Sequence, residues 1–253
     1  MACFFSTMRH ASSALLLALF CLTAKVGANE CNGTVFLTFD TGNMERAEFI
    51  AHTLKERNIR ATFFLANTPT RRGDHALDQS WRDYWRERVS EGHAFGNHTW
   101  SHYYVRKDMA NGQLQVTDRN GKRVILNNRQ YCSELDRVEK QFLQLTGKSL
   151  SAMWRAPGGR TTQQSLLWAN DCGFPMHVGW DPAGYVGDDL PSERYSNEVL
   201  LNKALKNIKS GDIILMHLGI WSRKTPLAPV LPQLIDGLQQ RGFCFDVIRG
   251  GQR

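Results

Sequence analysis

Short runs of apolar and β-branched residues recur along the chain, which is typical of buried β-strands. They lie at residues 35–39, 61–65, 94–97, 153–155, 176–180, 213–217 and 243–247. Between most of these runs the apolar positions repeat every three to four residues, the spacing of an amphipathic helix. Such stripes predict helices over residues 44–57 and around residues 81–89, 135–145 and 231–238.

Strands that alternate with helices in this way predict an α/β fold, in which a parallel sheet is covered by helices. Seven such strands indicate a closed or nearly closed β/α barrel, and 253 residues suit one such domain. In barrels of this kind the reacting groups lie at the carboxyl ends of the strands. Asn43 is positioned to cap the first helix.

One segment, residues 105–128, interrupts the alternation. It contains two short β-rich runs, at residues 113–117 and 122–126, on either side of Asn120-Gly121. This pattern predicts a β-hairpin inserted beside the barrel. Such a hairpin either shapes a substrate groove or merely decorates the fold.

The first 28 residues have the features of a signal peptide. Arg9 precedes an apolar run at residues 14–20 that is too short to span a bilayer, and small residues follow it. We expect cleavage between Ala28 and Asn29, which leaves one domain over residues 29–253 of an exported, periplasmic or secreted protein. An uncleaved membrane anchor is the alternative; otherwise the chain has no segment suited to a membrane.

The charge of the chain narrows its partners only slightly. Residues 29–253 hold 29 basic and 24 acidic residues, a net charge of +5. That balance favours an anionic envelope or polymer surface. There is no block of Lys and Arg of the kind that binds nucleic acid.

Four cysteines remain beyond residue 28: Cys31, Cys132, Cys172 and Cys244. In an exported protein they permit two disulfides, with three possible pairings, or they are buried free thiols. We expect a bridge between Cys31 and Cys244, because they lie at the starts of the first and last strands. These strands are neighbours if the barrel closes.

Polar residues follow the predicted strands and form one chemically coherent set. They are Asp40, His98, His102, Arg155, Asp181 and His217. A carboxylate, a histidine pair and a separate histidine are what metal-assisted hydrolysis requires. His98 and His102 are four residues apart, so on a helical turn both imidazoles could reach one ion. Taken singly, each of these residues also has a purely structural explanation.

The order of these motifs resembles that of the polysaccharide deacetylase family, also called the NodB-homology family or carbohydrate esterase family 4. The resemblance covers roughly residues 34–247. Its motifs stand at Thr38–Gly42, His98–His102, Arg155–Gly159, Trp180–Asp181 and Leu215–His217. It implies a distorted (β/α)7 barrel that hydrolyses N-acetyl groups of a carbohydrate polymer.

The resemblance also implies a role for each matching residue. Asp40 matches the catalytic base, Arg155 the residue that orients it, and His217 the general acid. Asp181 matches the acid that holds the arginine. His98 and His102 match the ligands of a divalent metal, expected to be zinc. Trp180 and Leu215 are expected to line the acetyl pocket, and Pro157 to contact the substrate.

These roles agree with the chemistry of amide hydrolysis. Asp40 would take a proton from water, while a neighbouring arginine keeps it ionised and oriented. His217 would give its proton to the leaving nitrogen. The backbone N–H of Thr41 could add to the oxyanion site.

The sequence departs from the family pattern at Thr41, which stands where the family has a second aspartate as its third metal ligand. Threonine is a poor ligand for a site with two neutral histidines. Three interpretations follow: an ion held weakly, completed by water or Asp40; metal-free hydrolysis; or a non-catalytic descendant that binds polysaccharide. Hydrolysis of a small linear or cyclic amide is the alternative activity.

Overall fold

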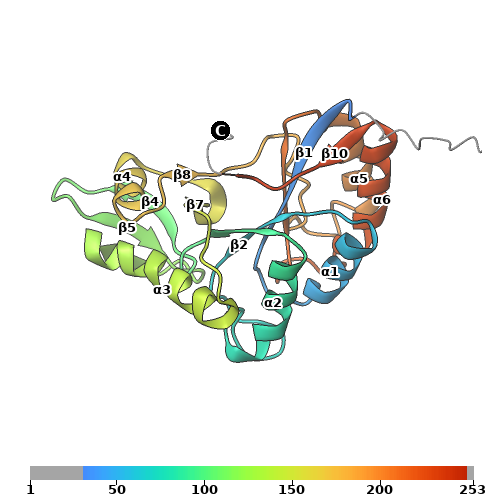
Figure 1. Cartoon of the computed structure of the whole chain (residues 1–253). Helices are drawn as coiled ribbons and strands as arrows, with labels where there is room; N and C mark the ends of the chain where they lie inside the picture. The colour runs from blue at the N-terminus through green and yellow to red at the C-terminus, as the bar shows by residue number, and fades with distance from the viewer. Residues whose placement is uncertain (1–30, 250–253) are drawn as a thin grey trace, which may run out of the picture. The chain divides into compact units, whose positions relative to one another are not determined.

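The computed structural model describes residues 31–249, and the predicted signal peptide lies outside them. Seven parallel strands form the central sheet, in the order β10-β1-β2-β3-β7-β8, with β9 also paired to β1 (Figure 1). They are β1 (Gly33–Asp40), β2 (Thr62–Leu65), β3 (Ala94–Asn97), β7 (Met153–Trp154), β8 (Met176–His177), β9 (Ile213–His217) and β10 (Phe243–Phe245). Each corresponds to one of the predicted apolar runs.

The sheet curls into a distorted barrel in which β1 pairs with β2, β9 and β10. Its first residues pair with β10, from Gly33 opposite Phe243, and its last residues pair with β9. On the far side, the chain beyond β8 reaches β9 through a single parallel bridge between Tyr185 and Leu215. The predicted α/β barrel is therefore present, with an irregular junction between β8 and β9.

Six α-helices accompany the strands within residues 31–249. They are α1 (Ala47–Glu56), α2 (Arg82–Ser90), α3 (Asn128–Thr146), α4 (Gln163–Asp171), α5 (Asn197–Asn207) and α6 (Leu231–Gln240). The stripes in the sequence identified α1, α2, α3 and α6 but neither α4 nor α5. The predicted cap of the first helix is wrong: α1 begins at Ala47, and the Asn43 side chain instead accepts a hydrogen bond from the Glu45 amide at 3.0 Å.

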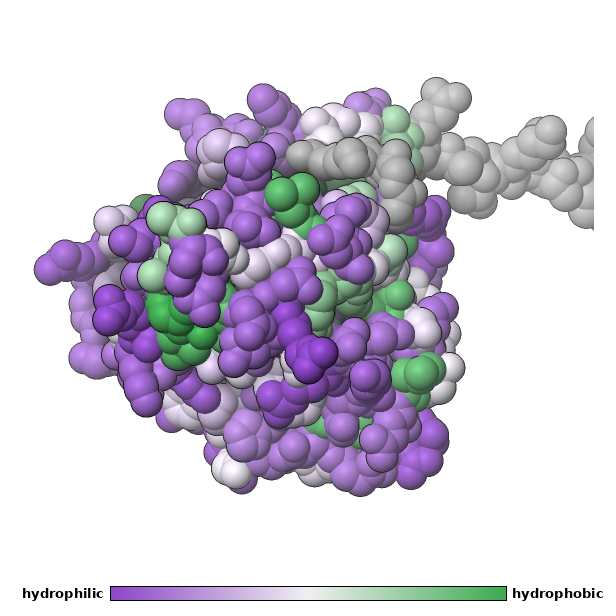
Figure 2. Space-filling view, turned by 90° about the vertical axis from the view of Figure 1, so that its left-hand side faces the viewer, coloured by the Kyte–Doolittle hydropathy of each residue, from purple (hydrophilic) through white to green (hydrophobic). Residues whose placement is uncertain are grey.

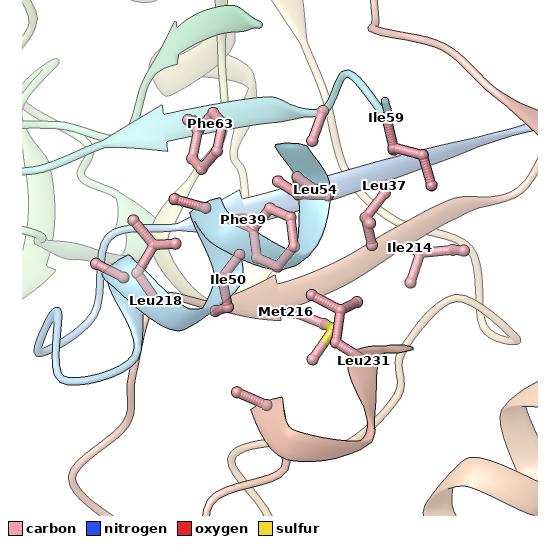
Figure 3. Close-up of a cluster of buried hydrophobic side chains, with 14 of the residues drawn as sticks. Leu37, Phe39, Ile50, Leu54, Ile59, Phe63, Ile214, Met216, Leu218 and Leu231 are labelled. Carbon is pink, nitrogen blue, oxygen red and sulfur yellow. The ribbon is translucent and has the colours of Figure 1, made fainter. Parts of the chain in front are cut away.

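The largest hydrophobic core lies between the strands and the helices that cover them. Leu37 and Phe39 of β1 meet Phe63 of β2 and the buried face of α1, which includes Ile50 and Leu54 (Figure 3). Burying an aromatic or aliphatic side chain of this size contributes roughly 1.5–3 kcal/mol. This packing holds the ends of β1 and its neighbours in place.

The inserted segment is a three-stranded antiparallel sheet rather than a simple hairpin. It consists of β4 (Tyr104–Asp108), β5 (Leu114–Thr117) and β6 (Arg123–Leu126), of which the sequence predicted the last two. Its apolar face packs with residues of α3 and β7 in a second core, formed by Val105, Leu114, Val116, Leu126, Tyr131, Leu135 and Trp154 among others. In Figure 1 the insertion lies beside α3 and α4.

Two disulfides join distant parts of the described chain. Cys31 pairs with Cys244, with a Cα–Cα distance of 5.6 Å, which confirms the expected bridge between the first and last strands. Cys132 pairs with Cys172 and links α3 to the end of α4. No helix within residues 31–249 is long and apolar enough to cross a membrane. The molecular face shown in Figure 2 is mostly hydrophilic, with small separate apolar areas.

Candidate active site

A cavity of about 500 Å³ opens at the carboxyl ends of the strands. Asp40 ends β1 and His217 ends β9, and these two residues lie opposite each other in the β1–β9 ladder. His98 and His102 come from the loop after β3, and all four side chains line the cavity. The structure thus brings together residues that are up to 177 positions apart in the sequence.

Asp40 is held by a buried arginine. Arg155 Nη1 donates to Asp40 Oδ1 at 2.8 Å, while Nε and Nη2 donate to the carbonyls of Val178 and Gly179. Burial alone would raise the pKa of Asp40, but His98 and Arg155 outweigh it and hold that pKa below its ordinary value. Asp40 is therefore ionised and fixed in orientation, as a general base requires.

His217 is paired with a carboxylate that the sequence did not single out. Its Nδ1 lies 3.0 Å from Asp188 Oδ1, and its backbone N–H donates to Asp188 Oδ2 at 2.7 Å. Burial would lower the pKa of His217, but the Asp188 charge overcomes it, and the pKa rises to about 9. This imidazole therefore remains protonated at neutral pH, with Nε2 available as a proton donor.

The histidine pair lies on an irregular loop and not on the helical turn that the sequence suggested. Thr99 and His102 adopt positive φ angles of 61° and 53°, which L-residues rarely adopt. The two imidazole rings nevertheless meet, with centroids 4.8 Å apart and planes nearly perpendicular. Burial lowers the pKa of both rings, that of His102 to about 3.

A buried glutamate on α3 supports this loop. Glu134 accepts hydrogen bonds from the Ser101 amide at 2.6 Å and from Ser101 Oγ at 3.0 Å. Its backbone carbonyl also accepts from the Trp100 amide. These bonds fix the residues between His98 and His102, although nothing in the local sequence indicates that Glu134 faces them.

Of the other predicted site residues, two line the cavity and two do not. Trp180 and Leu215 line the cavity, whereas Pro157 is buried and its neighbour Gly158 lines the cavity instead. Asp181 Oδ2 accepts from the Ile213 amide at 2.8 Å and so ties the chain after β8 to β9. Its expected hold on Arg155 stays a prediction.

The expectation that the Thr41 amide donates to the oxyanion is wrong. The Thr41 amide already donates to the Phe64 carbonyl at 3.2 Å, within the contact between β1 and β2. A backbone N–H that is used in this way is not available to a developing oxyanion. The sequence could not show this, because it does not reveal the register of the strands.

Several cavity residues carried no signal in the sequence. Tyr104 and Arg119 come from the inserted sheet, Tyr185 and Asp189 from the chain before α5, and Trp221 from the loop after β9. Trp221 is 49% exposed, and the Arg71 guanidinium lies 4.4 Å from its ring centroid. They surround the mouth of the cavity with aromatic and charged groups.

The profile of the polysaccharide deacetylase family matches residues 27–177, more than half of the chain. The chain belongs to the polysaccharide deacetylase family. A peptidoglycan-N-acetylglucosamine deacetylase of Bacillus cereus is 27% identical over 212 residues, which cover 83% of this chain and 65% of that protein. A chitooligosaccharide deacetylase of Azorhizobium caulinodans is also 27% identical, over 88% of this chain and 95% of its own.

A solved structure supports the fold of this polysaccharide deacetylase family member. The Bc1960 peptidoglycan N-acetylglucosamine deacetylase superposes with a TM-score of 0.63 at 25% identity, covering 85% of this chain and 86% of its own. The family assignment and the distorted α/β barrel therefore agree. The motifs that carried the resemblance in the sequence meet in the cavity.

The family generally uses a divalent metal, and the histidine pair fits such an ion only in part. His98 Nδ1 bonds the Arg155 carbonyl at 2.8 Å, which directs Nε2 into the site, 3.3 Å from Asp40 Oδ2. Thr41 offers no carboxylate, and its Oγ1 accepts from the Ala66 amide at 3.2 Å. Within residues 31–249, no group of three or more His, Cys, Asp or Glu side chains could hold a metal. The described residues therefore supply two histidine ligands, whereas catalytic zinc sites have three protein ligands.

Proposed function

We propose that this protein hydrolyses the amide bond of an N-acetyl group on an amino sugar of a carbohydrate polymer. The observation that carries this proposal is the pair formed by Asp40 and His217. They are partners on the adjacent strands β1 and β9. Their surroundings move their pKa values apart, down for Asp40 and up to about 9 for His217. Such a pair holds one base and one acid ready at the same pH.

Each side chain then has a step in the reaction. Asp40 accepts a proton from the attacking water, and Arg155 keeps it ionised and aligned. His217 donates its proton to the leaving nitrogen, and Asp188 stabilises the charged imidazole before that transfer. Trp180 and Leu215 enclose the acetyl methyl. A divalent ion on His98 and His102 would polarise the acetyl carbonyl and lower the pKa of water.

The shape of the site favours a polymer over a small amide. A second hollow of about 340 Å³ lies next to the main cavity and shares Gly158 and Trp180 with it. A small amide fits an enclosed pocket, whereas a chain of sugars needs a groove that continues beyond the reacting unit. The exposed ring of Trp221 offers an apolar face on which a sugar can pack.

Release of acetate from N-acetylated chito-oligosaccharides tests the proposal. Asp40→Asn and His217→Ala should each lower kcat by about a hundredfold or more, the usual contribution of a positioned acid or base. Asp136→Asn and His52→Ala on exposed helix surfaces are matched controls and should keep full activity. Near-normal turnover in an Asp40 or His217 variant would remove that residue from the mechanism. An inactive wild type that still binds the oligomer would indicate a non-catalytic descendant.

We also propose export, with cleavage after Ala28, on the basis of the apolar leader. N-terminal sequencing of the protein recovered outside the cytoplasm should begin at Asn29. A start that still contains residues 14–20 would show that the segment is a membrane anchor.

A further inference from the structure

The inserted sheet brings a cation to the mouth of the catalytic cavity. Arg119 lies in the turn between β5 and β6 and lines the same cavity as Asp40 and His217. Within residues 31–249 its side chain makes no ion pair and no hydrogen bond. An arginine without an acidic partner beside a substrate cavity is suited to a substrate carboxylate, which its planar guanidinium can bind in bidentate fashion.

The backbone that carries Arg119 is well fixed. Asp118 Oδ1 accepts from the amides of Asn120 and Lys122, both at 2.9 Å, and the Asp118 carbonyl accepts from the Gly121 amide. The strands on either side are anchored by the second hydrophobic core, in which Leu114 and Val116 are fully buried. The turn is therefore a built part of the cavity wall, and only the arginine side chain needs to be ordered on binding.

The acids around the cavity are already engaged. Asp40 pairs with Arg155, and Asp188 pairs with His217. The remaining acid, Asp189, accepts a hydrogen bond from the Tyr185 hydroxyl. Arg119 and Asp189 both act on the Tyr104 hydroxyl, whose pKa is raised mainly by burial. Both charges therefore lie near Tyr104 in the cavity wall.

We propose that Arg119 forms a subsite for a carboxylate on the sugar next to the N-acetylated unit, so that the preferred substrate is an acidic glycan. This rests on the proposed deacetylation at Asp40 and His217. The carboxylate has two chemical sources, a uronic acid or a lactyl ether on the neighbouring sugar. In both cases the fixed turn positions the guanidinium to bind it while the N-acetyl group lies over the catalytic pair.

The test compares substrates of equal length that differ only in charge. These are a neutral N-acetylglucosamine oligomer and two oligomers that alternate N-acetylglucosamine with a uronic acid or with a lactyl-ether sugar. The wild type should have the higher kcat/KM for at least one acidic oligomer. Arg119→Gln should reduce the ratio of acidic to neutral kcat/KM by about tenfold, as expected for the loss of a charged hydrogen bond. Arg119→Lys should keep part of it.

Arg123→Gln is the matched control, because Arg123 is an exposed cation of the same sheet that does not line the cavity. It should leave the ratio unchanged. If Arg119→Gln lowers kcat/KM equally on acidic and neutral oligomers, the proposal is overturned. If Asp189→Asn then causes the same equal loss, the two residues only close the cleft and do not bind a carboxylate. If no oligomer releases acetate, the deacetylase proposal fails. Calorimetric binding of the acidic oligomers to wild type and Arg119→Gln then still decides the subsite.

Discussion

Replacing Asp188 by Asn should convert His217 from an acid that works at neutral pH into one that works only in acid. The substitution keeps the size of the side chain and removes its charge. Both contacts to His217 are short, 3.0 Å to the ring and 2.7 Å to the backbone N–H. The burial that lowers the pKa of His217 stays, while the largest influence that raises it is lost.

The size of the effect follows from the pKa values. In the wild type the pKa of His217 is raised to about 9. Without Asp188 it should fall to about 6.5 or lower, a change of about 3 kcal/mol in favour of the neutral ring at about 1.4 kcal/mol per pKa unit. At pH 8, about 3% or less of the imidazole would then be protonated. Activity at pH 8 should therefore fall about thirtyfold, whereas activity near pH 5.5 should change far less.

The assay is the pH dependence of kcat for acetate release, combined with NMR titration of the His217 ring. The alkaline limb should move from about pH 9 to below about pH 7. Asp189→Asn is the control, because it changes the net charge equally but does not bond His217, and it should move the limb much less. An alkaline limb that stays in place in Asp188→Asn, with the ring titration shifted, would show that His217 is not the general acid.

The same pair should also make stability depend on pH. A histidine whose pKa is raised in the folded state stabilises the fold below its unfolded pKa of about 6.5. That contribution is lost as the pH rises through about 9. The free energies of unfolding of wild type and Asp188→Asn, measured by urea denaturation, should therefore differ more at pH 6 than at pH 10.

Three further substitutions have defined outcomes. Thr41→Asp adds an anionic ligand beside the histidine pair and should tighten zinc binding. The measurement is acetate release while zinc is added to each protein. An unchanged zinc affinity would mean that residue 41 does not face the ion. Glu134→Ala should lower kcat about tenfold by releasing Ser101 and the strained loop, and Glu134→Gln should restore much of it; equal losses would contradict a positioning role. Replacing Cys31 and Cys244 by Ser should lower the free energy of unfolding by about 2–5 kcal/mol in urea, with no effect if the bridge does not form.

Much of the architecture can be inferred from local patterns. The seven parallel strands coincide with apolar runs because a strand buried on both faces must be apolar throughout. Once parallel strands are placed, their carboxyl ends share one edge, so the strand pattern alone groups Asp40, His98, Arg155 and His217. The bridge between Cys31 and the last strand follows from the same closure.

Local patterns failed where a contact between distant segments decides the outcome. The α5 helix has only two buried residues, Leu200 and Ala204, so it lacks a clear apolar stripe. Asn43 has the composition of a cap, but its side chain is used in the turn before α1. The loop from His98 to His102 resembles a helical turn in spacing, yet hydrogen bonds to α3 hold it in an irregular conformation.

The sequence by itself determined the set of parallel strands, the motifs and the types of groups that could react. Only the tertiary structure decided which groups meet. Asp188 lies 29 positions before His217, and no periodicity links them; the parallel contact between the chain after β8 and β9 places the carboxylate against the ring. In the same way, strand register uses up the Thr41 amide, and the packing of the inserted sheet places Arg119 at the cavity. Proton affinity and hydrogen bonding depend on distances of a few ångströms, and in a folded chain those distances are set by packing between segments.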